Sequence, residues 1–142
     1  MTIIPVAVGL ILDDEGNILV SKRIDPQTPA ADGKWDFIGG KVEPGENPEE
    51  TIVREAKEET GLEIKPLRLL PKILSNVWER KDLGTTQALL LAYECSVVGG
   101  TLHTQNFDHK IAELKFIPPR DLDSYDTLAS VKELLALLKA VT

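Results

Sequence analysis

The segment 40–62, GKVEPGENPEETIVREAKEETGL, constrains this chain most, because it combines a strong helix start with many acidic side chains. Asn47 can cap a helix, and Pro48 suits the first helical position. Glu50 stands three residues after Asn47, where the acid of a capping box belongs. The segment therefore predicts a helix that begins beside Asn47, runs to about Thr60 and stops at the glycine that follows.

The acidic residues of this helix fall together on one arc, at about 100° per residue. The residues of that arc are Glu55, Glu58 and Glu59. A second arc, which can be buried against a sheet, carries Ile52, Val53 and Ala56. Like charges four residues apart repel each other on a helix, so the acidic arc should weaken it unless a partner offsets the charge. Clustered carboxylates suit Mg²⁺ or Mn²⁺, whereas the simpler interpretation is a solvated surface helix.

The remaining pattern predicts short strands and a second helix. The predicted strands are residues 3–12, 18–22, 67–76, 85–98 and 112–117. The predicted connections are a turn over 13–17, a loop over 24–34, a charged loop over 79–84 and a turn at 99–100. A final amphipathic helix is predicted over 126–140, with an apolar side made of Leu128, Val131, Leu134, Leu135 and Leu138. This mixture favours an α/β domain in which helices pack on a sheet.

Composition and charge limit the classes of function. A chain of 142 residues suits one domain with a single core. The net charge of −7 and the lack of a basic patch argue against a nucleic acid polymer, although metal ions could mediate contact with a small polyanion. No apolar stretch suits a membrane span, and the first residues do not resemble a signal peptide. The single cysteine, Cys95, is predicted to be a buried strand residue of an intracellular protein.

The spacing within the segment 40–62 resembles the Nudix box of the Nudix hydrolases, with no fixed position missing. The matching positions are Gly40, Glu46, Arg54, Glu55, Ala56, Glu58, Glu59, Gly61 and Leu62. The box covers 23 of the 142 residues, and the WDFIGG and ELKFI stretches outside it are also similar to the family. One departure is Ile38, where many relatives have a proline before the glycine pair.

The resemblance implies a Nudix-type α/β/α sandwich, with a mixed β-sheet between helices, formed by a single domain over residues 1–142. It also implies that Mg²⁺ or Mn²⁺ assists the attack of water on a phosphorus of a nucleoside diphosphate-linked substrate. The expected metal ligands are Gly39, Gly40, Glu55, Glu58 and Glu59. The expected catalytic residues are Glu46, Arg54, Glu55, Glu58 and Glu113. Arg54 is expected to orient the helix acids and Glu46 to support the loop, and either a box glutamate or Glu113 to be the general base.

Five further residues are candidates for substrate binding. Arg23 and Lys41 match positions that relatives often use for phosphates, although each could be an ordinary surface charge. Trp35, Phe37 and Trp78 are candidates to stack on a base. Trp35 and Phe37 alternate on a strand, so one face of that strand could simply be core.

The resemblance is strongest to the MutT-like branch, which implies hydrolysis of a nucleoside triphosphate, including an oxidised one, to monophosphate and pyrophosphate. Relatives that read oxidised guanine use an asparagine just before the final helix, and residues 126–130 contain none. Asp126 or Thr127 could read a base edge instead. Hydrolysis of dinucleoside polyphosphates or ADP-ribose is an alternative, as is a non-catalytic nucleotide-sensing module. The expected partner is a small nucleotide, with no nucleic acid polymer or membrane. The expected location is the cytoplasm, and a homodimer fits family habit.

Overall fold

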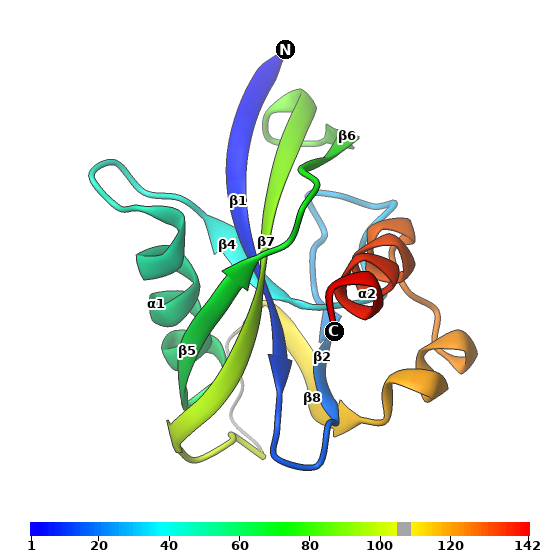
Figure 1. Ribbon diagram of the computed structural model, residues 1–142. Coiled ribbons are helices and arrows are strands. Elements are labelled where there is room, and N and C mark those ends of the chain that lie inside the picture. The colour runs from blue at the N-terminus through cyan, green and yellow to red at the C-terminus, as the bar shows by residue number, and fades with distance from the viewer. Residues whose placement is uncertain (105–108) are drawn as a thin grey trace.

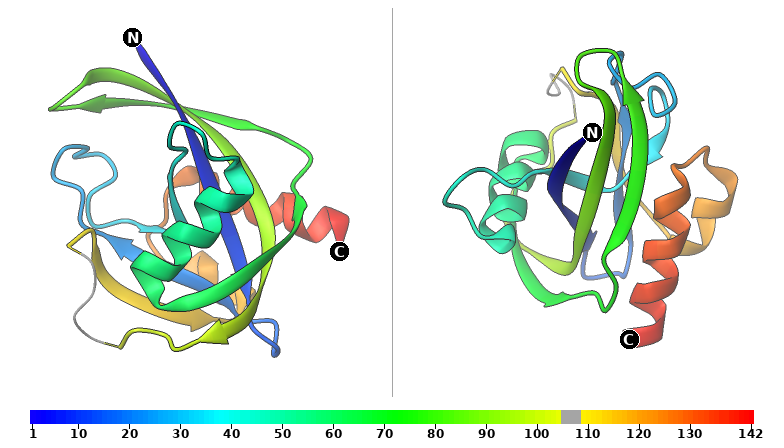
Figure 2. Two further views of the ribbon diagram at one scale, coloured as in Figure 1. Left: turned by 90° about the vertical axis from the view of Figure 1, so that its left-hand side faces the viewer. Right: turned by 90° about the horizontal axis from the view of Figure 1, so that it is seen from above.

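A mixed sheet of eight strands lies between helices in the computed structural model, which describes residues 1–104 and 109–142 (Figure 1). The strands are β1 (Thr2–Leu12), β2 (Ile18–Arg23), β3 (Trp35–Asp36), β4 (Ile38–Lys41), β5 (Leu62–Leu69), β6 (Leu74–Arg80), β7 (Gly84–Gly100) and β8 (Ile111–Ile117). The helices are α1 (Pro48–Thr60), the 3₁₀ helix η1 (Pro119–Ser124) and α2 (Ala129–Val141). Because α1 covers one face of the sheet and α2 the other (Figure 2), the predicted α/β/α sandwich is confirmed.

The sheet is mixed because β1 and β7 run parallel while the other pairings are antiparallel among the described strands. β1 and β2 form the predicted hairpin, whose turn is held by Asp13 Oδ1 accepting from Glu15 N at 3.0 Å and Asn17 N at 2.9 Å. β4 pairs with β1 in a register that sets Gly40 opposite Ala7. This pairing brings the glycine pair under α1.

The predicted strand over 67–76 is wrong, because this stretch contains the break between two strands. β5 ends at Leu69, and β6 begins at Leu74. Pro71 lies between them and has no N–H group to donate to a strand ladder. β1 occupies one edge of β7, so β5 and β6 follow one another along its other edge.

Two predicted connections are shorter than expected because strand pairing continues into them. In the predicted loop over 79–84, the pairs Glu79↔Thr85 and Arg80↔Gly84 extend the β6–β7 hairpin. The predicted turn at 99–100 belongs to β7, since Gly100 pairs with the first residue of β5. The length of each connection therefore depends on how far the flanking strands continue to pair.

The second helix begins later than the predicted start at Asp126. Trp35 N donates to Asp126 O at 2.9 Å, and Leu128 N donates to Trp35 O at 3.1 Å. These bonds form an isolated parallel bridge between Trp35 and Thr127, so the backbone there is extended. α2 can begin only at Ala129, and the apolar side predicted for it is buried.

The first helix starts and stops as predicted. Asn47 Oδ1 accepts from Glu50 N at 3.0 Å, and Asn47 N donates to Glu50 Oε1 at 3.4 Å, which completes the capping box. Gly61 ends the helix with φ at 81°, a left-handed conformation that glycine adopts without steric cost.

The buried face of α1 is turned away from Val53, which is 38% exposed rather than buried as predicted. Ile52 is fully buried on β1, where a Cβ at Gly9 would lie 2.8 Å from Ile52 Cγ1. The glycine thus permits close packing of this side of the helix. As a result Glu55 and Glu59 face inward, at 8% and 7% exposed.

The core consists of one apolar cluster on each side of the sheet. Ile11 and Ile52 belong to the cluster under α1, and Val131 and Leu134 to the cluster under α2. Burying one such side chain contributes roughly 1.5–3 kcal/mol. Cys95 is buried in β7, as predicted, and burial raises the pKa of its thiol to about 12. Neither α1 nor α2, in the described parts of the chain, is long and apolar enough to cross a membrane.

Candidate active site

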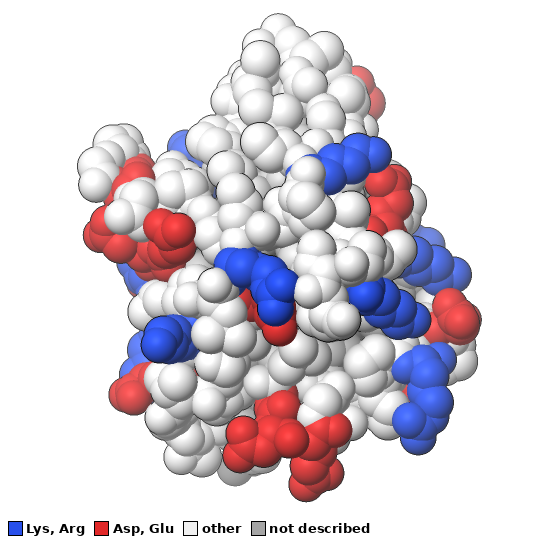
Figure 3. All heavy atoms as spheres, in the orientation of Figure 1, with Lys and Arg blue, Asp and Glu red and all other residues white. Residues whose placement is uncertain are grey.

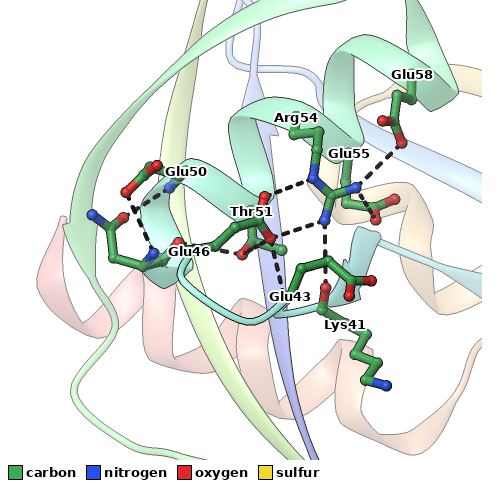
Figure 4. Close-up of polar contacts among 9 residues, drawn as sticks. Lys41, Glu43, Glu46, Glu50, Thr51, Arg54, Glu55 and Glu58 are labelled. Carbon is green, nitrogen blue, oxygen red and sulfur yellow. Dashed lines mark hydrogen bonds and ion pairs between the residues drawn. The ribbon is translucent and has the colours of Figure 1, made fainter.

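Arg54 and Glu46 join α1 to the loop that precedes it (Figure 4). Arg54 Nε donates to Glu46 Oε2 at 2.7 Å and Arg54 Nη2 donates to Glu46 Oε1 at 3.0 Å. Glu43 N and Thr51 Oγ1 also donate to Glu46 Oε1, at 3.0 and 2.9 Å. The bond from Arg54, followed by that from Glu43, lowers the pKa of Glu46 from 4.5 to about 2. The stabilisation is therefore complete above pH 4.5 and lost as the pH falls toward about 2.

Arg54 is also the partner that offsets the charge of the acidic arc. Its Nη1 donates to Glu55 Oε1 at 2.9 Å and to Glu58 Oε2 at 3.3 Å. Its hydrogen bond to Glu46, together with the bond and charge of Glu55, raises the pKa of the Arg54 guanidinium above its usual value. The repulsion within α1 is thus reduced by a cation of the chain itself.

Glu55 packs its carboxylate against the backbone of β4. A Cβ at Gly40 would lie 2.3 Å from Glu55 Cδ, so a side chain at position 40 would occupy the space that Glu55 fills. Glu59, one turn further along, is also buried, whereas the Glu58 side chain is 56% exposed. Two of the three predicted metal carboxylates therefore turn toward the sheet, and the third faces solvent.

A cavity of about 530 Å³ is lined by Glu59, whereas Glu55 and Glu58 are not among the described residues of its lining. It reaches from Gly40 and Glu59 to the start of α2, and its volume lies in the range of small-molecule sites. Four of the five residues predicted to bind substrate line it, namely Arg23, Phe37, Lys41 and Trp78. The tertiary structure therefore brings together the acidic end of the box and most of the predicted substrate residues.

Arg23 lies in the cavity wall between two aspartates. Its Nη1 donates to Asp36 Oδ2 at 2.9 Å, and its Nη2 is paired with Asp25 Oδ2. Burial lowers the pKa of Arg23, but Asp36 and Asp25 outweigh this effect and raise it overall. Burial also raises the pKa of Asp36 by more than Arg23 lowers it. Sequence reasoning missed both aspartates as partners, although Asp36 stands within the WDFIGG stretch.

Trp35, in contrast, packs in the core and is not among the described residues that line the cavity. It is 8% exposed, and its ring meets that of Tyr125 edge-on at a centroid distance of 5.1 Å. Lys115 Nζ lies 5.0 Å from the centroid of the Trp35 ring. Phe37 belongs to the same core cluster, at 3% exposed, but it also lines the cavity.

Glu113 lies on the other side of β8 from the core under α1. Its neighbour Leu114 packs in that core, and alternation along a strand turns Glu113 to the opposite face. The Glu113 side chain is 54% exposed, and Lys115 Nζ lies 4.0 Å from its Oε2. Glu113 is not among the described residues that line the cavity.

The acidic helix also shapes the surface. On the face shown in Figure 3, acidic side chains gather over α1 and the loop before it. Glu43, Glu49 and Glu50 are exposed there. Such a surface disfavours the approach of a polyanion unless cations accompany it.

The oxygen atoms near Gly40 have the chemistry that Mg²⁺ or Mn²⁺ requires. Within residues 1–104 and 109–142, no three His, Cys, Asp or Glu side chains converge as a ready-made metal site. Mg²⁺ usually needs only one or two carboxylates and completes its shell with water and substrate phosphate oxygens. Glu55, which packs on Gly40, and Glu59, which lines the cavity together with the glycine pair, fit this donor set.

Asn76 and Ser130 are among the polar cavity residues that sequence reasoning missed. Asn76 on β6 and Ser130 on α2 both line the cavity. Asn76 stands two residues before Trp78, so strand alternation could have placed them on one side. Ser130 depends on where α2 begins. Asp126, considered as a base reader, is 72% exposed and binds Lys34 Nζ at 2.8 Å instead.

The sandwich, the acidic helix and the adjacent cavity agree with a Nudix domain. A protein-family model described as "NUDIX domain" matches residues 3–138, so the chain belongs to this family. The resemblance inferred from the segment 40–62 is therefore confirmed.

Individual relatives agree with this membership. "Putative nudix hydrolase 1" of Caenorhabditis elegans is 32% identical over 108 residues, which are 75% of this chain and 27% of that protein. "8-oxo-dGTP diphosphatase" of Proteus vulgaris is 33% identical over 75 residues, which are 53% of this chain and 65% of that protein. The chain thus spans less than two thirds of the length of these curated relatives. The structure of a NUDIX hydrolase from Nitrosomonas europaea, 21% identical, has a TM-score of 0.76 over 96% of this chain and 88% of that chain, which confirms the fold.

Proposed function

We propose that this chain hydrolyses a nucleoside triphosphate to the monophosphate and pyrophosphate, with Mg²⁺ or Mn²⁺ as cofactor. One observation carries the proposal. The inward-facing carboxylate Glu59 and the glycine pair line the same cavity of about 530 Å³ as Phe37 and Trp78. A single nucleotide could thus place its polyphosphate at the acidic end of the cavity and its base at the aromatic end.

The cavity has the walls that a nucleoside requires. Phe37 is 3% exposed, Trp78 is half-buried, and the strand residues beside them are apolar, including Val6 and Leu90. Aromatic rings can stack on a base. Lys41 is exposed next to Gly40, where its ammonium can attract phosphate oxygens. Arg23, already paired with two aspartates, would position the wall and contact the substrate with its remaining donors.

Glu55, Glu58 and Glu59, with a main-chain carbonyl of Gly39 or Gly40, would hold the metal ions. When bound, these ions neutralise charge on the pyrophosphate and activate water. Arg54 keeps Glu55 and Glu58 in place through its hydrogen bonds, and Glu46 fixes Arg54 from the loop side.

A side chain of the protein accepts the proton that the attacking water releases. The oxygen of a water molecule attacks one phosphorus, the anhydride P–O bond breaks, and pyrophosphate leaves with the bonding electrons. A box glutamate accepts the proton of the attacking water. Glu58 suits this step, because its exposed carboxylate is the one in the acidic arc that solvent reaches most readily.

The name of the Proteus vulgaris relative supports a nucleoside triphosphate over ADP-ribose or a dinucleoside polyphosphate. Residues 126–130 lack the asparagine expected of proteins that read oxidised guanine, so the base preference is a separate question. A cytoplasmic homodimer is part of the proposal only through family habit.

A phosphate-release assay tests the proposal. The protein is incubated with each NTP, each dNTP and oxidised dGTP, in the presence of pyrophosphatase and of Mg²⁺, Mn²⁺ or EDTA. Phosphate should appear only with metal and only when pyrophosphatase is present, because the direct product is pyrophosphate. ADP-ribose and diadenosine polyphosphates, followed by phosphatase, test the alternatives in parallel.

Glu58→Gln and Glu59→Gln should each lower kcat by roughly 100-fold or more while circular dichroism shows an intact fold. Glu49→Gln is the matched control, since Glu49 is an exposed acid of the same helix outside the cavity. Unchanged turnover in both site variants, or turnover that persists in EDTA, would refute the proposed site. A folded wild-type protein that binds nucleotides without turnover would favour the sensing module.

A further inference from the structure

Ser130 and Asn76 are polar residues of the cavity lining, and neither takes part in a side-chain hydrogen bond found among the described residues. Ser130 is 4% exposed, and its hydroxyl makes no bond within the described part of the protein. Asn76 is half-buried, and its amide is equally unpartnered there. Neither side chain belongs to the fully buried, unpartnered polar atoms of the described residues, so both polar groups are accessible to a ligand in the cavity.

The surroundings of Asn76 exclude a neighbouring strand as a hydrogen-bond partner of its side chain. The register of β6 sets Asn76 beside Ala88 of β7, and β1 sets Ile4 beside Ala88 in turn. All three line the cavity, so the amide stands in a row of apolar side chains. It therefore points its donor and acceptor into the cavity space.

Ser130 reaches the cavity from a different wall. It is the second residue of α2, whose N-cap residue Leu128 gives no side-chain cap. Leu128 and Leu134 line the cavity on either side of it. The hydroxyl is thus a single polar group in an otherwise apolar part of the wall. A pocket with apolar walls and a few placed polar groups uses those groups to orient its ligand.

We propose that Ser130 and Asn76 determine specificity, by hydrogen-bonding the edge of the nucleobase that lies against Phe37 and Trp78. This inference rests on the proposed function, because it assigns the aromatic end of the cavity to a heteroaromatic base. A hydroxyl can donate and accept, and a carboxamide does both at once, so together they match a base edge that alternates donors and acceptors. A base with the wrong edge would leave both groups without hydrogen-bond partners. A site of this kind rejects such a base strongly.

Ser130→Ala and Asn76→Leu remove the polar atoms with little change in volume. Each should reduce the ratio of kcat/KM between the best and the worst of the four nucleoside triphosphates by at least tenfold. Asn76→Asp, which replaces a donor by an acceptor, should change which base is preferred rather than weaken all four alike. Ser75→Ala and Ser124→Ala are matched controls, since both serines are exposed and lie outside the described lining.

A binding measurement separates this inference from the proposed function. Calorimetry with the four nucleoside monophosphates reports base preference without turnover. If the wild-type protein hydrolyses nothing, the proposed function fails, but a base-dependent Kd that Ser130→Ala and Asn76→Leu abolish still supports the inference. Variants that fold, as judged by thermal melting, and keep the wild-type ratio of Kd values would overturn it. If Ser130→Ala does not fold, Asn76→Leu and Asn76→Asp provide the test of the inference.

Discussion

At the scale of single residues, the close approach of Gly40 and Glu55 is the tightest steric constraint in the site. A Cβ at position 40 would lie 2.3 Å from Glu55 Cδ, and Gly40 is not among the glycines with positive φ, so the constraint is steric. Gly40→Ala should therefore displace Glu55, lower the free energy of unfolding by about 1–3 kcal/mol and reduce turnover on the order of 100-fold. Chemical denaturation and steady-state kinetics would measure these two effects.

The double variant Gly40→Ala, Glu55→Ala is the control for this steric explanation. Removing the carboxylate should recover most of the lost stability, because the clash disappears, whereas activity should stay low. If the single and double variants were equally destabilised, the clash with Glu55 would not be the cause.

Among the elements, α1 carries the box acids, and its first turn is stabilised by the two reciprocal hydrogen bonds of the capping box. Asn47→Ala removes the acceptor of Glu50 N and should lower the free energy of unfolding by about 1 kcal/mol. Asn47 does not line the cavity, so kcat/KM per folded molecule should stay unchanged. Asn47→Ser, which can still cap, should retain most of the stability in the same denaturation experiment. A large loss of turnover in Asn47→Ala, with unchanged stability, would contradict this division of roles.

Across the whole molecule, Arg68 connects the sheet to the end of the final helix. Its Nε lies 2.7 Å from Glu94 Oε1 on β7, and its Nη1 donates to Val141 O at 2.7 Å. Glu94 is 8% exposed, so Arg68→Met would leave a buried carboxylate without its partner. The free energy of unfolding should fall by roughly 1–3 kcal/mol, measured by denaturation, while the order of substrate preference stays the same.

The pair can be tested by removing both charges. Arg68→Met with Glu94→Leu should be more stable than Arg68→Met alone, because replacing both partners by apolar groups leaves no buried charge unpaired. Equal destabilisation in the two variants would mean that packing of the Arg68 side chain, rather than its charge, holds α2 in place.

Sequence reasoning worked best where the signal is local. The cap at Asn47 and the stop at Gly61 involve groups only a few residues apart, so their chemistry can be read directly from the chain. It was wrong where a distant strand decides the outcome. Residues 67–76 contain a strand break because β5 and β6 share one edge of β7, and the start of α2 is delayed because residues 126–128 bond to Trp35.

The sequence by itself determined the two-sided α/β fold, the helix that carries the box and the acidic residues near the site, because periodicity, capping and motif spacing are properties of neighbouring residues. Only the tertiary structure decided that Phe37 lines the cavity while Trp35 does not, although both belong to one core cluster. It also decided that Asn76 and Ser130 share that cavity, and that Glu113 faces away from the core under α1. The physical reason is that a cavity is formed by strand register and helix docking, which bring together residues far apart in the chain.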